Sequence, residues 1–244
     1  MRRPRSPLIA ALLGACLILG ACNQGGSTAS SETEPAPTAQ NQTNNAPGVN
    51  IHPRTDSPAP PSPSTSPSTP TPAAVPAGYA SVSAPTAGVT FAAPADWLVV
   101  SASEVQADES KLEDLAAQLN MSADSLRTIM SPVDIYVLDQ SGTQDFSNNI
   151  NVLSQTYSSA TVTEDAMTTG IKSIGATPGQ FSTESTANGD ARVLTYTWDL
   201  GGQTLQGAAM YVPNTEGKYA SVTVTTLDAA LTGQIADTII ATAA

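Results

Sequence analysis

The chain has 244 residues, of which 21 are acidic and 9 basic, and its formal net charge at pH 7 is −12. This balance disfavours nucleic acid and anionic lipid head groups as partners and favours cationic ones. Both of its 2 cysteines precede residue 23. The absence of cysteine from residues 23–244 excludes an internal disulfide and a cysteine-rich metal site there.

The first residues have the layout of a secretory signal peptide. Three arginines lie within the first five residues, and an apolar run from about Pro7 to Gly20 follows and ends in small residues. This run is too short for a transmembrane helix, which needs about 20 apolar residues. We therefore predict a signal peptide over residues 1–21.

The residues at the end of this run, Leu19, Gly20, Ala21 and Cys22, resemble a bacterial lipobox. The resemblance implies cleavage before Cys22 and a diacylglyceryl group on its thiol. A second match ends at Cys16, but it leaves only about five apolar residues after Pro7, fewer than an export signal needs. An ordinary secreted protein is the alternative. Two acyl chains anchor a protein stably, which predicts attachment to the extracytoplasmic face of the cell membrane.

The next stretch has the composition of a disordered linker. It holds 13 of the 19 prolines and is otherwise rich in Ser, Thr, Ala, Asn and Gln. Such a segment cannot bury enough apolar surface to offset its ordering entropy, so we expect extended chain over residues 22–86. O-glycosylation of this linker and a bare spacer remain alternatives. The only histidine, His52, lies here and is not expected to form a site.

From about residue 88 the pattern is that of a folded domain. Two apolar, β-branched runs, 88–92 and 97–100, predict strands separated by a turn. An amphipathic helix is predicted from about 107 to 120, because its leucines recur at i, i+3 and i+7. A shorter helix should begin after Ser122, a suitable N-cap, and end at Pro132.

The second half of the domain alternates strands and helices. Strands are predicted over 133–138 and 149–157, and a helix should run from Thr163 to a Gly175 cap. The period of the hydrophobic pattern then changes to two residues, which is typical of strands, and Asn188-Gly189 is predicted as the first hairpin turn. A last helix begins near Asp228. The four strands before it are predicted at about 179–186, 190–198, 203–212 and 218–225.

This order of elements predicts one α+β domain over residues 87–244. Long antiparallel strands with helices between and after them favour an α/β/α sandwich with a largely antiparallel sheet. The domain holds 18 of the 21 acidic residues and 5 of the 9 basic ones, so its surface is acidic.

The chain resembles a known family, the LpqN-type lipoproteins of actinobacteria, which have a Mog1/PsbP-like domain. The matching features are Phe91, Pro94 and Trp97 in an opening F-x-x-P-x-x-W pattern, the run 148–152 entering a strand, and the meander followed by a helix. The resemblance implies this fold and a location in the cell envelope. It brings no catalytic residues with it, since family members are mostly interaction modules or proteins of unknown role.

The domain offers few groups for catalysis. It contains no His or Cys, which excludes a Ser-His-Asp or Cys-His site and the usual zinc sites, and it has no nucleotide-binding glycine loop. A carboxylate pair of the glycosidase kind is conceivable near one hairpin, from Glu184, Asp190 and Asp199. An acidic group on the first helix is either a solvated helix face or a weak cation site: Glu104, Asp108, Glu109, Glu113 and Asp114.

Three functions follow from these observations. The first is an interaction module of the cell envelope that recruits a protein or polymer through its acidic or sheet surface. The second is a carrier of a small apolar molecule between sheet and helix, and the third, remote one is a carboxylate-based enzyme. We expect no enzymatic activity, no cofactor, no bound metal and no nucleic-acid partner. Core packing is the alternative to a ligand cleft for the larger aromatic residues: Trp97, Phe181, Tyr196, Trp198 and Tyr211.

Overall fold

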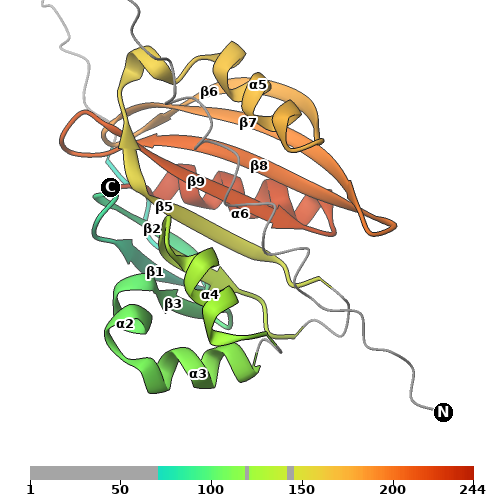
Figure 1. The fold of residues 1–244 in the computed structure, drawn as a ribbon. Coiled ribbons are helices and arrows are strands. Elements are labelled where there is room, and N and C mark those ends of the chain that lie inside the picture. The colour runs from blue at the N-terminus through green and yellow to red at the C-terminus, as the bar shows by residue number, and fades with distance from the viewer. Residues whose placement is uncertain (1–70, 119–120, 142–145) are drawn as a thin grey trace, which may run out of the picture. The chain divides into compact units, whose positions relative to one another are not determined.

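In the computed structural model of the protein, the described residues are 71–118, 121–141 and 146–244. The predicted signal peptide, Cys22 with its lipobox and most of the predicted linker lie outside these ranges. The described residues form two antiparallel sheets and the helices that cover them (Figure 1).

The larger sheet has seven strands in the order β3-β4-β5-β9-β8-β7-β6, and every neighbouring pair is antiparallel. A separate two-stranded sheet pairs β1 with β2. The strands are β1 (Tyr79–Ala84), β2 (Val89–Pro94), β3 (Leu98–Ser101), β4 (Val133–Leu138), β5 (Asn149–Tyr157), β6 (Thr177–Thr186), β7 (Gly189–Leu200), β8 (Gln203–Pro213) and β9 (Tyr219–Thr226).

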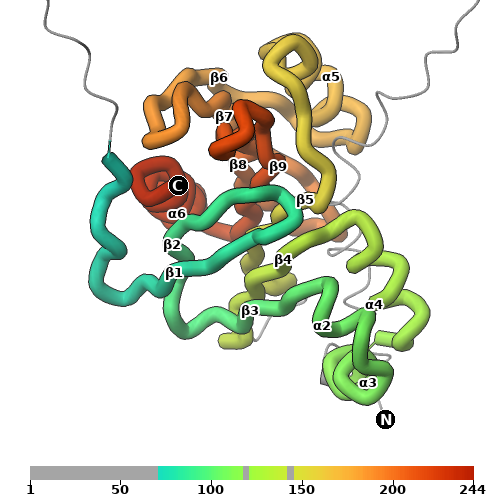
Figure 2. Tube along the Cα trace, turned by 90° about the vertical axis from the view of Figure 1, so that its left-hand side faces the viewer, coloured from blue at the N-terminus to red at the C-terminus, as the bar shows by residue number. Residues whose placement is uncertain are grey.

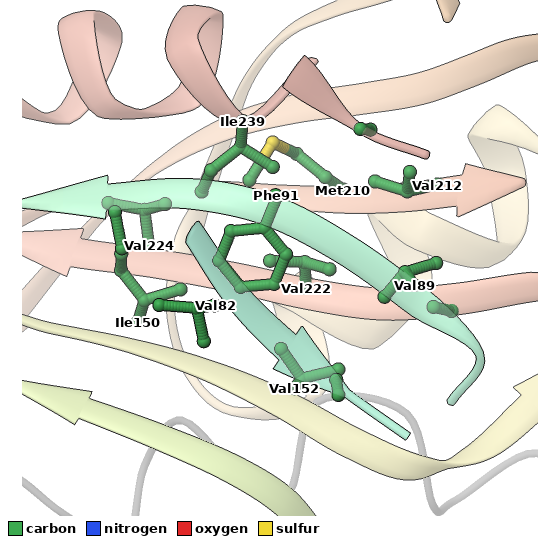
Figure 3. Close-up of a cluster of buried hydrophobic side chains, with 14 of the residues drawn as sticks. Val82, Val89, Phe91, Ile150, Val152, Met210, Val212, Val222, Val224 and Ile239 are labelled. Carbon is green, nitrogen blue, oxygen red and sulfur yellow. The ribbon is translucent and has the colours of Figure 1, made fainter. Parts of the chain in front are cut away.

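One face of the large sheet is covered by the β1–β2 hairpin and by α6 (Ala229–Thr242). Side chains alternate along each strand, so Ile150 and Val152 of β5 point to this face together with Val222 and Val224 of β9. Phe91 of β2 lies among them (Figure 3). This cluster is the largest hydrophobic core of the domain.

The opposite face holds two separate hydrophobic clusters. One packs α2 (Ala102–Ala107), α3 (Glu109–Gln118) and α4 (Ala123–Met130) against β3 and β4, and the other packs α5 (Glu164–Ser173) against β7 and β8. Figure 2 shows α6 and α5 on different sides of the strands. Helices therefore cover both faces, and the predicted α+β class with a largely antiparallel sheet is confirmed.

The strand β1 was not expected, because residues 22–86 were predicted as disordered linker. Its side chains alternate at the end of the strand, with Val82 and Ala84 buried and Ser83 between them exposed. Upstream of it, the backbone N–H of Ala73 donates to the carbonyl of Ala241. Composition missed this strand because Ser and Ala give a weak strand signal, and pairing with β2 outweighs that preference.

Two further local predictions are confirmed with shifted bounds. The helix predicted over about 107–120 is present as α3, and a short helix that was not predicted, α2, precedes it. The two helices are separated at Asp108, whose Oδ1 accepts the backbone N–H groups of Ser110 and Lys111. Such a side-chain bond competes with the helical pattern and starts a new helix. The first meander hairpin turns at Ala187 and Asn188, and Gly189 already opens β7.

The predicted helix starts are confirmed by their caps. The Ser122 hydroxyl accepts the N–H of Ser125, the Thr163 hydroxyl accepts that of Ala166, and the Asp228 carboxylate accepts that of Leu231. Each bond satisfies one of the backbone donors that a helix start leaves open. Gly175 has a φ of 80° directly after α5, as predicted for its C-terminal cap.

Candidate functional site: a groove between α6 and the outer strands

A groove of about 520 Å³ lies between α6 and the outer strands β6, β7 and β8. The sheet forms its floor and one side of α6 its wall. The floor carries several hydroxyl and amide groups, and Pro178, Val193 and Ala208 are its apolar members. The polar side chains that line the groove without charge are Thr177, Gln180, Ser182, Thr195, Thr197, Gln206 and Thr232.

Small residues on α6 keep the groove open. Ala229, Gly233 and Ala236 line it together with Ile240, while Ile235 and Ile239 point into the main core. A Cβ atom added to Gly233 would meet no heavy atom within 4 Å outside its own helix. The helix packs on β2, β8 and β9 and also contacts β6, and the groove is the space that remains between these elements and β7.

A bulge in β6 shapes one end of the groove. The pairing shifts between Pro178 and Phe181, and the Thr195 hydroxyl accepts the backbone N–H of Gln180 at 2.8 Å. A Cβ on Gly179 would come within 2.5 Å of that hydroxyl oxygen. Gly179 is thus needed for the close approach of the two strands.

The charges of the groove are all negative. Glu184 of β6 and Asp237 of α6 line it, and no basic side chain is among the described residues that do so. Both carboxylates are exposed. The groove therefore provides hydrogen-bonding groups and negative charge for a neutral or cationic ligand.

Tyr196 borders the groove, but its ring lies on the opposite face of the sheet. The ring lies over Gly207, where a Cβ would collide with it, and its hydroxyl is 2.9 Å from Thr225 Oγ1. Burial raises the pKa of Tyr196 to about 12, although the hydrogen bond with Thr225 acts in the opposite direction. The phenol therefore stays neutral, and it has a structural role in the hydrophobic cluster between the sheet and α5.

The acidic group predicted on the first helix is divided between solvent and local bonds. Asp108 caps α3, and Glu109 accepts two hydrogen bonds from Arg127, which also bonds Asp124. Glu104, Glu113 and Asp114 are exposed. No group of three or more potential metal ligands occurs among the described residues. The solvated helix face therefore describes these acids better than a cation site.

The three candidate carboxylates of the glycosidase kind are not brought together. Asp190 and Asp199 lie at opposite ends of β7, nine residues and therefore roughly 30 Å apart. Each bonds a neighbouring hydroxyl, from Ser185 and Thr204 respectively. Glu184 alone of the three lines the groove.

The large aromatic residues are core residues. Trp97 belongs to the main core, Tyr196 and Tyr211 to the cluster under α5, and Phe181 and Trp198 pack against that cluster. Core packing therefore describes them, and of the five only Tyr196 also borders the groove.

The run that enters β5 fixes a corner of the fold. Asn148 donates to Asp139 Oδ2 at 2.9 Å and accepts the N–H of Leu227 at 3.1 Å. Burial acts to raise the pKa of Asp139, but hydrogen bonds from Ser141 and Asn148 outweigh it and lower the pKa. Asn148 thus joins the β4–β5 connection to the start of α6.

Of the groove residues, sequence analysis named only Glu184, as a candidate carboxylate, and Tyr196, as an alternative cleft residue. One signal was present: β7 alternates aromatic and aliphatic residues with Thr195 and Thr197 on its other face. Hydroxyls on a strand face that a helix should cover indicate an incompletely covered face.

Among the described helices, none is long and apolar enough to cross a membrane.

No protein-family model and no curated protein matches the chain. Among solved structures, it is similar to the cyanobacterial PsbP protein (CyanoP) of Synechocystis sp. PCC 6803. The TM-score is 0.42 at 13% sequence identity, and the match covers 69% of this chain and 92% of that chain. PsbP belongs to the fold group named in the predicted resemblance, but a similarity of this size supports no statement about function or site. The fold assignment therefore rests on the observed topology, an α+β domain with a largely antiparallel seven-stranded sheet.

Proposed function

We propose that the chain is a lipid-anchored binding protein on the extracytoplasmic face of the cell membrane and that its ligand binds in the α6 groove. The observation that supports this most is the groove itself, about 520 Å³ between one helix and three strands. Volumes of about 300–1,000 Å³ are usual for ligand sites. The signal-peptide pattern and Cys22 motivate the location.

The lining is mixed, with more apolar than polar surface, and its charges favour a ligand that is neutral or positively charged. Hydroxyl and amide side chains supply donors and acceptors, and Glu184 and Asp237 add negative charge. The domain as a whole is acidic, which favours the same class of partner. We therefore favour an interaction module, with a protein or an envelope polymer as its partner, and we assign no reaction to the two carboxylates.

The groove can be filled without disturbing the core. Gly233→Trp directs a large side chain into open space and replaces a weak helix former by a better one. Gln234→Trp is the matched control, because Gln234 is exposed and does not line the groove. With a photo-cross-linking residue at position 237 of the full chain in its native cells, Gly233→Trp should abolish the adduct and Gln234→Trp should keep it. An adduct that survives Gly233→Trp would mean that the ligand binds elsewhere.

A carrier of a small apolar molecule is the second candidate, favoured by the volume of the groove and its position between helix and sheet. Native mass spectrometry of the purified chain separates the two. A carrier should show a constant added mass that Gly233→Trp removes, whereas an interaction module should show the mass of the chain alone.

The membrane anchor has its own test. Cys22→Ala removes the only thiol available for the predicted acylation, because the other cysteine, Cys16, lies in the predicted signal peptide. The variant should move from the detergent phase to the aqueous phase in a detergent partition, since two acyl chains account for stable membrane binding. A variant that stays in the detergent phase contradicts the single-anchor proposal.

A further inference from the structure

The two edges of the seven-stranded sheet differ in length and protection. One edge is β3, with 4 residues, and the other is β6, with 10 residues. Within the described part of the chain, β6 pairs with β7 alone. An open edge strand presents unpaired N–H and C=O groups to any extended chain, and proteins usually shorten or block such edges.

Only the first half of β6 is blocked. Pro178 lacks an N–H, and the bulge at Gly179 and Gln180 interrupts the regular pairing. From Phe181 to Thr186 the register with β7 runs without a shift. The single charged residue in this regular half is Glu184. The half that could pair with another strand lies beside the groove through Ser182 and Glu184, and the blocked half lines the groove as well, from Thr177 to Gln180.

The side chains of this regular half alternate between two environments. Ser182 and Glu184 line the groove, whereas Phe181 packs against the cluster under α5. A strand added to the edge would continue this alternation, so every second side chain of the added strand would lie beside the groove. Glu184 and Asp237 are the charges that it would meet there.

We propose that β6 receives an extended, basic segment of a partner protein as an eighth strand, with its groove-side Lys or Arg residues near Glu184 and Asp237. Charge complementarity supports this occupant. None of the five basic residues of the domain lines the groove, and Arg127 and Lys218 are engaged with acids of their own surroundings. Main-chain hydrogen bonds then give affinity and the alternate side chains give specificity. The inference rests on the proposed function and names its partner class.

The test uses the full chain in its native cells, with a photo-cross-linking residue at position 182 or, in a second variant, at position 99. Val99 is the matched control, because it is exposed on β3, the other edge of the sheet. Position 182 should give an adduct that maps to one continuous segment of one protein, with Lys or Arg at alternate positions, and position 99 should not. A synthetic peptide of that segment is then the probe for the purified mature chain.

Binding of this peptide should slow exchange of the backbone amides of residues 181–185 that face the open edge by about tenfold or more, while amides paired with β7 change little. Glu184→Lys should lower the affinity for the peptide by about tenfold. Glu104→Lys makes the same charge change on α2 and should leave the affinity unchanged. Adducts on a glycan, on lipid or on scattered segments, or unchanged exchange in β6, would overturn the inference. If position 237 gives a groove-dependent adduct and position 182 gives none, the proposed function stands and the strand addition fails.

Discussion

The side chain of Tyr196 connects strands β7, β8 and β9 of the large sheet. Its ring fills the space above Gly207, and its hydroxyl bonds Thr225 two strands away. Because the group is fully buried, it stays neutral in the folded chain well above the pH at which an exposed tyrosine ionises.

This burial predicts a loss of stability at alkaline pH. The pKa of Tyr196 is about 12 in the folded chain and about 10 in the unfolded one, so the unfolded state alone gains from ionisation between these values. The contribution of Tyr196 is fully present below pH ~10 and is lost as the pH rises to ~12, by on the order of 3 kcal/mol. Denaturant unfolding at pH 8, 10 and 11.5 should therefore show a smaller decline in Tyr196→Phe than in the natural chain. Parallel declines would contradict the assignment.

At the scale of elements, the β1–β2 hairpin is joined to the large sheet by two polar side chains. Asp134 Oδ2 accepts the backbone N–H groups of Thr86 and Ala87 at 2.8 and 3.0 Å. Asn214 donates to the carbonyl of Ala87 at 3.0 Å. Because Asp134 is buried at the turn of the hairpin, these bonds fix its position as well as contributing to stability.

Asp134→Ala should lower the free energy of unfolding by about 3 kcal/mol, because it removes both bonds and leaves a buried N–H without a partner. Asp96→Ala is the control, since Asp96 lies exposed in the next turn of the chain. Denaturant titration of both variants measures the difference. Equal stability of the two would mean that the hairpin is held by its apolar contacts alone.

At the scale of the whole molecule, the boundary of the folded domain lies earlier than composition indicated. Val82 and Ala84 of β1 are part of the main core, and β2 also bonds the end of the chain through Thr90 and Ala244. A domain that starts at residue 87 would lose one strand of the hairpin and expose the apolar side of the other.

A chain of residues 71–244 should therefore unfold in one cooperative thermal transition, and a chain of residues 87–244 should melt at a lower temperature or without cooperativity. Loss of Val82 alone should cost about 2–3 kcal/mol, because it removes a buried aliphatic side chain. Calorimetry of both chains measures this. Identical transitions would show that β1 is dispensable.

The sequence by itself determined most of the elements and their order, with β1 and α2 as the exceptions. Caps such as Ser122, Thr163 and Asp228 act within one helical turn, and the alternation in the meander is set by the two-residue period of a strand. These signals are local, so they can be read from a short window of residues. The α+β class followed from them, as did the acidic charge of the domain.

Only the tertiary structure decided where the open surfaces lie. The groove exists because α6 presents small residues, Gly233 and Ala236, toward the outer strands, and no local pattern in the sequence states how the helix is placed on the sheet. The same holds for β6, whose place at the sheet edge follows from strand order. Core packing and strand pairing join residues far apart in the chain, so the candidate site became visible only in the assembled fold.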